Sequence, residues 1–250
     1  NAGVRANNHS EYGSHWVYNI NPSYQFERIP LRLLTSYSTA YITPSLYQLY
    51  GPFGNTALTP EENATAEVGF ETILFNEKLT INAVGFYRQE KNTFGFFFDF
   101  VTSDAFYINN EGKNNAKGVE TNVNLEVNKS INFAANYTFT EVEQQFNRFI
   151  PKNKVNANAN FKITEKLGTS LIYQYVSDRS DAFYDEANFV TETVNLKAYQ
   201  LFNANIRYQV IPNRLALFGA VDNIFNEEFQ EVIGYNTRGR NFRIGMNFQF

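Results

Sequence analysis

The chain contains no cysteine, which excludes disulfide bonds and thiolate metal sites within it. It has only two histidines, His9 and His15, too few for a multi-histidine metal centre. The formal net charge is −4 over 250 residues, so nucleic-acid binding has no electrostatic support. No run approaches the roughly 18 apolar residues of a membrane-spanning helix. We therefore expect no metal, no cofactor and no nucleic-acid partner.

Aromatic residues are abundant in a chain that is polar on average. There are 16 Tyr and 25 Phe, yet the mean hydropathy is −0.39. A soluble core normally uses more Leu, Ile and Val and fewer aromatics. A membrane β-barrel, in contrast, needs a wet interior and an exterior girdled by aromatic rings.

The dominant periodicity of the sequence is two residues. From Val119 to Val127, apolar residues or Thr at odd positions alternate with Glu or Asn at even positions. Similar alternation recurs over residues 131–139, 154–163, 202–210 and 241–250. Because successive side chains of a strand point to opposite faces, each run predicts a strand with one apolar and one polar face.

About twelve strands are predicted, most near the ~9–11 residues that a tilted strand needs to cross a bilayer. The predicted ranges are 1–8, 15–26, 31–41, 63–74, 79–92, 116–127, 131–140, 152–163, 167–177, 198–210, 214–225 and 240–250.

Their connections alternate in length from the second strand onward. The short ones are 27–30, 75–78, 128–130, 164–166 and 211–213, and the long ones are 42–62, 93–115, 141–151, 178–197 and 226–239. Short turns on one side and long loops on the other are typical of bacterial outer-membrane barrels, whereas a β-sandwich has no reason to sort its loops in this way. We therefore predict an all-β fold, an antiparallel transmembrane β-barrel. Two open edges would be a liability, so either these strands close on themselves or further strands complete the sheet.

Three segments resemble the TonB-dependent receptor family. The first, residues 44–61, contains Asn55 and ends in Leu-Thr-Pro-Glu; it resembles the family's Asn…Leu-x-Pro-Glu signature. The second runs from Tyr107-Ile-Asn-Asn into Gly118-Val-Glu. The third has Asp222-Asn-Ile-Phe, then Gly239-Arg and a terminal Phe250. All three occur in the family's order over most of residues 31–250.

The resemblance implies that residues 1–250 are the C-terminal portion of one barrel of about 22 strands. The plug domain and the N-terminal strands would lie outside this sequence. The protein would be a multi-pass β-barrel of the bacterial outer membrane that imports a scarce nutrient with energy from TonB. TonB would act through the plug, outer-membrane lipid would surround the barrel, and the barrel-assembly machinery would recognise the last strand. The segment 234–240 makes the cobalamin receptor the most similar subfamily, and a ferric-siderophore receptor is the alternative.

Two sets of side chains follow as candidate sites. Residues of the long loops that could contact the nutrient are Tyr47, Tyr50, Phe53, Asn55, Phe97, Tyr235 and Arg238. Polar residues expected to face the lumen and hydrogen-bond the plug are Lys154, Asn158, Asn205, Arg207 and Arg243. No catalytic residue is predicted.

Several features have a plainer interpretation beside the functional one. The run Phe94–Phe100 suits an aromatic girdle with a strand extension above it better than a ligand surface. For Tyr47, Tyr50 and Phe53, binding and scaffold are equally well supported. Arg238 and Arg240 could bind an anion, but pairing with Glu227, Glu228 or Glu231 is the simpler expectation. The acids Asp178, Asp181, Asp185 and Glu186 do not have the spacing of an EF-hand and fit a solvated loop.

Two other classes of protein remain as rivals. A passive porin shares the alternation but should lack the Leu-Thr-Pro-Glu and Asp-Asn-Ile-Phe segments. An outer-membrane barrel enzyme would need a Ser–His or Asp–His arrangement near the outer rim, for which His9 and His15 are the candidates. We expect the protein not to be an enzyme.

Overall fold

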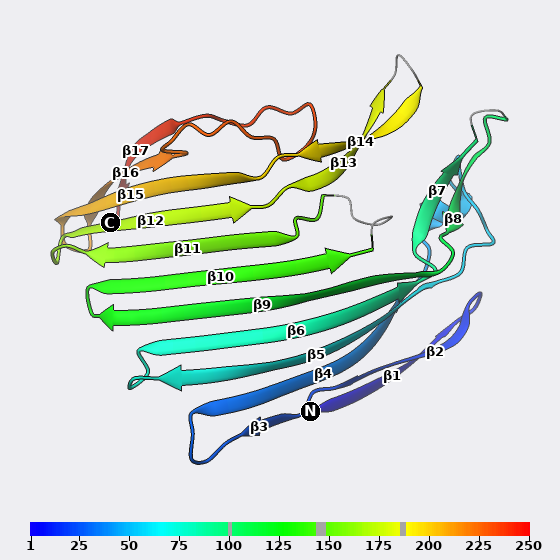
Figure 1. The fold of residues 1–250 in the computed structure, drawn as a ribbon, viewed down its shortest axis with the longest axis horizontal. Helices are drawn as coiled ribbons and strands as arrows, with labels where there is room; N and C mark the ends of the chain where they lie inside the picture. Colours follow the sequence, from blue (N-terminus) through cyan, green and yellow to red (C-terminus); the bar gives the residue numbers. More distant parts are fainter. Residues whose placement is uncertain (100–101, 144–148, 186–188) are drawn as a thin grey trace. The chain divides into compact units, whose positions relative to one another are not determined.

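The computed structural model describes residues 1–99, 102–143, 149–185 and 189–250. Nearly all of its regular structure is β-strand (Figure 1). The first strands are β1 (Ala2–His9), β2 (Gly13–Ile20), β3 (Ser23–Gln25), β4 (Leu31–Ile42), β5 (Glu61–Leu74), β6 (Leu79–Lys91), β7 (Phe94–Phe98), β8 (Ala105–Asn109) and β9 (Lys113–Asn128). The others are β10 (Ile131–Val142), β11 (Asn153–Lys162), β12 (Leu167–Val176), β13 (Arg179–Asp185), β14 (Val190–Leu196), β15 (Tyr199–Ile211), β16 (Leu215–Asp222) and β17 (Asn241–Phe248).

One short helix, α1 (Leu46–Tyr50), interrupts the strands of the described chain. Among these residues, no helix has the length and apolar character needed to cross a membrane.

The main sheet has 13 strands in the order β1-β2-β4-β5-β6-β9-β10-β11-β12-β15-β16-β17, with β3 paired to β4. Neighbouring strands in this order follow one another along the chain, apart from two inserted hairpins, β7–β8 and β13–β14, which form small sheets of their own. The predicted all-β antiparallel fold is therefore confirmed, and each of the twelve predicted strands overlaps an observed one.

The predicted strand map needs two corrections. The strand predicted at 15–26 is divided into β2 and β3 by Asn21 and Pro22, because proline has no N–H for the β-ladder. The long connections were predicted as loops, yet the described residues there include α1 and the hairpins β7–β8 and β13–β14.

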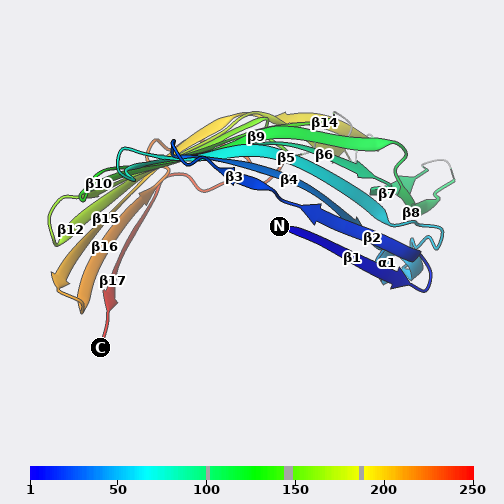
Figure 2. The same cartoon turned by 90° about the horizontal axis from the view of Figure 1, so that it is seen from below.

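The chain divides into two compact units. Unit 1 comprises residues 1–26, 32–70 and 84–118, and unit 2 comprises residues 27–31, 71–83 and 119–250. In unit 1, β1 and β2 form a hairpin in register from Ala2↔Ile20 to His9↔Gly13 and lie side by side (Figure 2).

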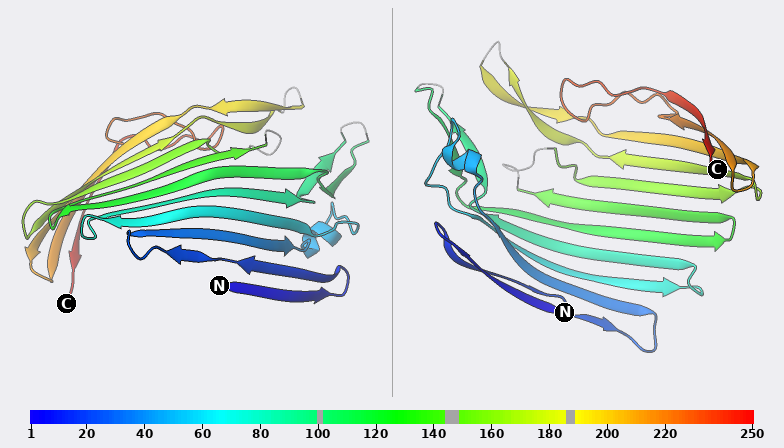
Figure 3. Two further views of the ribbon diagram at one scale, coloured as in Figure 1. Left: turned by 60° about the horizontal axis from the view of Figure 1, so that its bottom comes forward. Right: turned by 180° about the vertical axis from the view of Figure 1, so that it is seen from behind.

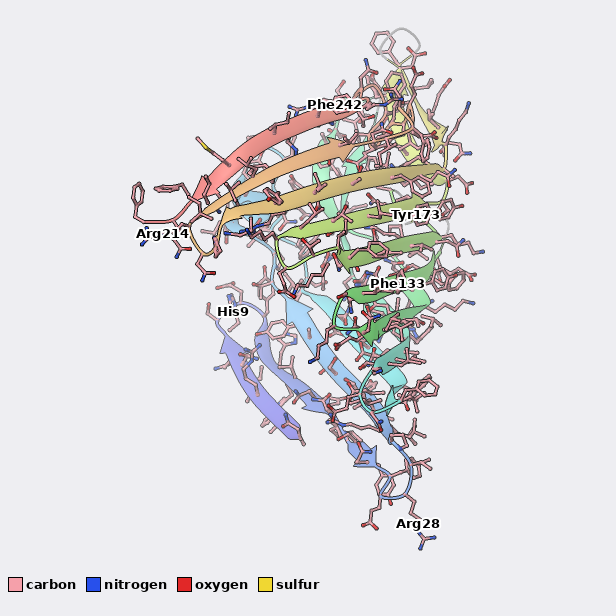
Figure 4. The ribbon with its side chains drawn as sticks, turned by 90° about the vertical axis from the view of Figure 1, so that its left-hand side faces the viewer. His9, Arg28, Phe133, Tyr173, Arg214 and Phe242 are labelled. Carbon is pink, nitrogen blue, oxygen red and sulfur yellow. The ribbon has the colours of Figure 1, made fainter. Side chains whose placement is uncertain are left out.

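Unit 2 shows the predicted sorting of connections by length. Turns at 129–130, 163–166 and 212–214 join β9 to β10, β11 to β12 and β15 to β16 at one end of the strands (Figure 1). The long connections join β10 to β11, β12 to β15 and β16 to β17 from the other end of these strands. Arg214 marks the short-turn end in Figure 4. We call the two ends the turn end and the loop end.

The two faces of unit 2 differ in chemistry, because directly paired residues share a face. One face exposes large apolar side chains, with Ile244 92% and Met246 72% accessible on β17. The other carries a row of hydrogen bonds between asparagines, described below as the amide ladder. A water-soluble sheet would bury the apolar face, so this exposure fits strands whose apolar face meets lipid.

Aromatic rings gather on the apolar face near both ends of the strands. Toward the loop end, the ring of Phe202 lies 4.8 Å from Tyr173 and 5.1 Å from Phe225, centroid to centroid. Toward the turn end, Phe133 contacts Phe161 at 6.0 Å. Figure 4 shows Phe133 and Tyr173 on their strands. Two aromatic bands of this kind are typical of the two membrane interfaces of an outer-membrane barrel.

The candidate ligand-binding loops

The segment between β4 and β5 in unit 1 is built around α1. The Ser45 side chain accepts a hydrogen bond from the Gln48 backbone N–H at 3.2 Å, and the Gln48 side chain accepts one from the Ser45 N–H at 2.9 Å. This capping box satisfies orphan donors at the helix start. At the other end, a Cβ on Gly51 would lie 2.4 Å from the Tyr47 carbonyl oxygen, so the turn after the helix requires glycine. The helix position is thus fixed locally by Ser45, Gln48 and Gly51.

Two asparagines fasten this segment to the β7–β8 hairpin. Asn55 donates from Nδ2 to the Tyr107 carbonyl at 2.8 Å and accepts from the Ala57 N–H at 2.9 Å. Asn109 accepts from the Thr59 N–H at 2.8 Å and donates to the Thr59 carbonyl at 2.9 Å. It also donates to the Asn92 carbonyl at 2.7 Å. The first two family-like segments of the sequence therefore form one hydrogen-bonded junction.

Exposed aromatic residues stand on this junction. We call them the aromatic cluster: Tyr47, Tyr50, Phe53, Phe96, Phe97, Phe98, Phe106 and Tyr107. The rings of Phe53 and Phe96 meet edge to face at 5.5 Å, and Tyr107 contacts both Phe96 at 5.3 Å and Tyr47 at 6.3 Å. Figure 3 shows α1 beside the hairpin. The arrangement presents ring edges and faces to the surroundings on a firmly held backbone.

The predicted binding residues of unit 1 come together here. Tyr47, Tyr50, Phe53 and Phe97 are 58%, 68%, 43% and 41% accessible, which leaves their rings available to a ligand. Asn55 is different, because its side chain is occupied in holding the junction. The predicted strand extension in the Phe94–Phe100 run is present as β7, and Phe100 lies outside the described residues. Leu58 and Pro60 of the Leu-Thr-Pro-Glu segment are buried beneath.

A second group of loops, in unit 2, is held by a buried arginine. Arg179 at the start of β13 is only 7% accessible, and its Nη2 donates to the carbonyls of Gln230 and Glu231 at 3.0 and 3.2 Å. Its guanidinium lies 5.6 Å from the centre of the Tyr199 ring. The Tyr199 hydroxyl donates to the Glu231 carboxylate at 3.1 Å. These contacts join the base of the β13–β14 hairpin, the start of β15 and the loop between β16 and β17.

Burial and the neighbouring Glu231 carboxylate raise the pKa of Tyr199 to about 12, with Arg179 acting in the opposite direction. Tyr199 is the first residue of a 13-residue strand and packs against loop residues, beyond the ~9–11 residues that cross a bilayer. Its phenol is therefore protonated at neutral pH and acts as the hydrogen-bond donor. Sequence reasoning did not single out Arg179 or Tyr199, and it named Glu231 only as a partner for Arg238 or Arg240, since only the folded loops bring the three residues together.

The predicted residues of this loop lie at its surface. Tyr235 is 72% accessible, and the Arg238 side chain is exposed. The expected pairing of Arg238 or Arg240 with Glu227, Glu228 or Glu231 is wrong within the described residues, where no ion pair joins them. Glu231 instead faces Tyr199. A cavity of about 610 Å³ lies between this loop and the end of β14, lined in part by Lys197, Glu228 and Asn236.

The acidic residues compared above with a calcium-binding EF-hand are Asp178, Asp181, Asp185 and Glu186. The described chain contains no cluster of three metal-ligating side chains. Asp181 is 2% accessible and accepts from the N–H groups of Ala182 and Ile233 at 2.7 and 3.3 Å. It thus belongs to the packing between hairpin and loop. Glu186 lies outside the described residues.

The histidines considered for hydrolytic chemistry are held by local contacts in unit 1. His9 Nδ1 accepts from the Glu11 N–H at 3.1 Å. His15 Nε2 lies 3.0 Å from the Tyr12 carbonyl, and its ring stacks on Tyr41 at 4.6 Å.

The residues predicted to face the lumen share the polar face of unit 2. In the β-ladder, Asn158 of β11 lies opposite Ile172 of β12, which in turn lies opposite Asn203 of β15. Asn205 and Arg207 of β15 lie opposite Ser170 and Gly168 of β12. Lys154 lies two positions from Asn156 on the same face. Arg243 on β17 forms an ion pair with Asp222 at 2.9 Å.

The amide ladder crosses four strands on that face. Ser170 donates to Asn160 Oδ1 at 2.7 Å, Asn160 Nδ2 donates to Asn132 Oδ1 at 3.5 Å, and Asn132 Nδ2 donates to Asn124 Oδ1 at 2.9 Å. Asn156 donates separately to Asn136 at 2.9 Å. Apolar residues such as Ile172, Val176, Leu201 and Phe218 also stand on this face, for which the alternation predicts polar residues. The Phe218 ring covers Gly245, where a Cβ would lie 2.4 Å from its tip.

The comparisons with known proteins agree with this architecture. The family model described as "TonB dependent receptor-like, beta-barrel" matches residues 1–224. The chain belongs to this family.

Several solved receptors share the fold of this TonB-dependent receptor segment. The siderophore receptor PirA from Acinetobacter baumannii matches with a TM-score of 0.81 and 18% identity over 100% of this chain and 43% of its own. FpvA from P. aeruginosa, bound to a ferric pyoverdine, has a TM-score of 0.79 and 17% identity over 95% of this chain and 33% of its own. The ferric-catecholate receptor Fiu from E. coli gives 0.75 and 17%, covering 95% and 35%. At these identities the likeness shows the fold alone.

The chain spans between about a third and under half of the length of these receptors. It belongs to the outer-membrane β-barrel proteins, as the family and the similar structures do. By their descriptions these proteins are receptors and transporters rather than enzymes. None of those named is a cobalamin receptor, so the predicted subfamily has no support from the comparisons.

Proposed function

We propose that this chain is the C-terminal portion of a TonB-dependent receptor that captures a ferric siderophore at its outer loops and imports it. The supporting observation is the aromatic cluster, whose exposed rings stand on a backbone fixed by Asn55 and Asn109. Aromatic rings offer apolar contact area at low cost in conformational entropy, and they suit planar chelating groups such as catechols. Several solved structures of the same fold are siderophore receptors by their titles, which favours this ligand class.

Two other nutrients have weaker support. Cobalamin follows from the resemblance of residues 234–240 and stays a prediction. Copper is carried by a similar structure, the transporter OprC. However, copper prefers sulfur and imidazole ligands, and this chain offers one Met, two His and no Cys.

Transport would need parts beyond this chain. In this proposal the ligand binds the loops and the apex of a plug, and TonB pulls on the plug to open a path. The polar face with Lys154, Asn158, Asn205, Arg207 and Arg243 then serves as the wall against which the plug docks. The hydrogen-bonding capacity of this face and the Arg243–Asp222 ion pair are consistent with such a wet, reversible contact.

The test is calorimetric titration of the full-length receptor in detergent with a ferric catecholate, a ferric pyoverdine and cyanocobalamin. Tight one-to-one binding of a ferric siderophore supports the proposal, and tight binding of cyanocobalamin alone transfers the function to cobalamin import. Uptake of the bound ligand by cells, with and without a protonophore, then tests transport. Binding that is unaffected by changes in the aromatic cluster would remove that cluster from the site.

A further inference from the structure

Strands β2 and β4 part toward the end of β4 that precedes α1, which we call the loop end of unit 1. Although β2 spans Gly13–Ile20 and β4 spans Leu31–Ile42, their described ladder has only the pairs Asn19↔Ser38 and Ile20↔Tyr37. Next to these pairs, the Tyr18 N–H donates to the Thr39 hydroxyl at 3.1 Å instead of to a backbone carbonyl. The side-chain bond ends the ladder, and a space opens between the two strands.

The space is a groove of about 350 Å³ with aromatic walls. Trp16 and Tyr18 of β2 line one side, Tyr37 and Tyr41 of β4 line the other, and Ala64 of β5 contributes to the lining. The rings of Tyr18 and Tyr37 lie 5.9 Å apart. A narrow slot between rings of this kind fits a hydrocarbon chain, because the rings on both sides can pack against the chain by van der Waals contact.

The groove opens on the apolar face of the strands. The register pair Ile20↔Tyr37 places Ile20 and Tyr18 of β2 on one face with Tyr37 of β4, and the strands part beyond this pair. Trp16 and Ile20 are 66% and 51% accessible there, as is Val68 of β5 at 63%. The opposite face carries the bonds of Glu90 to Asn63 and Asn114. In an outer-membrane barrel the apolar face meets lipid, so the medium that covers this groove is the bilayer itself.

The lining changes from apolar to polar along the groove. Ile20 and Leu33 continue the apolar face toward the turn end, whereas Lys91 and Glu62 line the groove near the loop end. The His15 ring stacked on Tyr41 stands at the same end. An amphiphile fits this gradient in one orientation, with its chain toward the membrane centre and its head at the rim.

We propose that this groove binds one acyl chain of an outer-leaflet lipid, whose polar head contacts Lys91 and Glu62. The loop end of outer-membrane strands lies in the outer leaflet, which sets the source of the lipid. The site is separate from the aromatic cluster and requires only that the chain spans the outer membrane. Its occupant fills the space that the interrupted β2–β4 ladder leaves.

Trp16 gives the site its own optical probe, since it is the single tryptophan of this chain. The full-length receptor is reconstituted in vesicles that contain increasing fractions of a phosphatidylethanolamine with brominated acyl chains, which quench tryptophan on contact. Subtraction of the Trp16→Phe variant isolates the Trp16 signal. A binding groove gives quenching that saturates at a several-fold lower fraction of brominated lipid than simple contact with surrounding lipid does.

Ala64→Phe fills the groove, and Val68→Phe adds the same ring to the same strand and face outside it. We expect Ala64→Phe to abolish the saturating phase of quenching and Val68→Phe to preserve it. The number of lipids retained after mild purification, counted by native mass spectrometry, should fall in Ala64→Phe and stay the same in Val68→Phe. If Ala64→Phe fails to fold, Thr39→Phe narrows the groove from the β4 side, on the face that Tyr37 shares. Quenching proportional to brominated lipid in every variant would overturn the proposal and leave ordinary lipid contact.

Discussion

Thr59 and Asn109 are fifty residues apart and are joined by three hydrogen bonds: Asn109 Oδ1 accepts from the N–H and the hydroxyl of Thr59, and Asn109 Nδ2 donates to the Thr59 carbonyl. A side-chain amide can replace a strand partner in this way because it carries an acceptor and a donor side by side. These bonds tie the Leu-Thr-Pro-Glu segment to the end of β8. The aromatic cluster therefore depends on Asn109, together with Asn55, for its alignment.

Asn109→Ala should loosen the junction without unfolding the sheet. The variant loses the bonds to Thr59 and Asn92 and leaves partly buried backbone groups unsatisfied, at a cost of about 1–3 kcal/mol. We expect faster hydrogen exchange across 55–60 and 105–109 and at least about tenfold weaker siderophore binding. Asn247→Ala, at an exposed position of β17 in unit 2, is the matched control. Equal exchange in the two variants would contradict the proposed alignment.

Phe53→Leu tests whether the rings of the aromatic cluster contact the ligand. Leucine retains much of the apolar volume and loses the edge-to-face contact with Phe96, so the folding cost should be small. Loss of a ring–ligand contact costs about 0.5–1.5 kcal/mol, a roughly two- to twelvefold rise in Kd. The same substitution at Phe75, exposed in the turn between β5 and β6, should leave Kd unchanged. A normal Kd in Phe53→Leu would remove this residue from the site.

Tyr199 should make the stability of the unit 2 loops depend on pH in the alkaline range. Because its pKa is raised to about 12 in the fold from an ordinary value near 10, its contribution is complete below pH 10 and is lost as pH rises toward 12. Tyr199→Phe lacks this dependence and loses a bond to Glu231 that contributes about 1 kcal/mol at neutral pH. Urea unfolding at pH 8, 10 and 11.5, compared between the two proteins, measures the difference. Parallel loss of stability in both would refute the assignment.

The amide ladder and the docking of the plug can be separated by two substitutions on one strand. Asn160→Ala breaks the bonds to Ser170 and Asn132 and should destabilise the barrel by about 0.5–1.5 kcal/mol. Asn158 has no hydrogen bond from its side chain in the described part of the chain, so Asn158→Ala should leave unfolding unchanged. If the polar face docks the plug, Asn158→Ala should instead raise hydrogen exchange in the plug. If Asn158→Ala changes neither the unfolding of the barrel nor hydrogen exchange in the plug, Asn158 does not dock the plug.

The strands could be predicted from the sequence because alternation is a local property, and each observed strand of the main sheet except β3 had its own predicted range. The insertions were harder. Ser45 and Gln48 have the spacing of a capping box, but a helix of only five residues is too short to show a helical period, so the sequence predicts a loop there. The hairpin β7–β8 follows from pairing of Phe94 with Asn109, a tertiary feature without a periodic signal.

The candidate site was only partly predictable, for a related reason. Exposed aromatics in a long connection, such as Tyr50, can be selected from the sequence because they lie outside every predicted strand. Strand packing therefore does not account for them. The buried group around Arg179 could not, since its partners Gln230 and Glu231 offer backbone carbonyls, which every residue has. Asn55 shows the converse difficulty. A polar residue in a loop suggests a ligand, yet its amide is occupied by Tyr107 and Ala57.

The amide ladder also bears on how accurately the strands find one another during assembly. β10 and β11 both alternate Ala or aromatic residues with asparagine, so a slip of two residues would keep every side chain on its proper face. In the native register, Asn132 faces Asn160 and Asn136 faces Asn156. A two-residue slip would place Lys154 opposite Asn136 in one direction or Lys162 opposite Asn132 in the other, and would break the match. The pattern of apolar and polar residues is satisfied in both registers, whereas the hydrogen bonds between paired asparagines favour the native register.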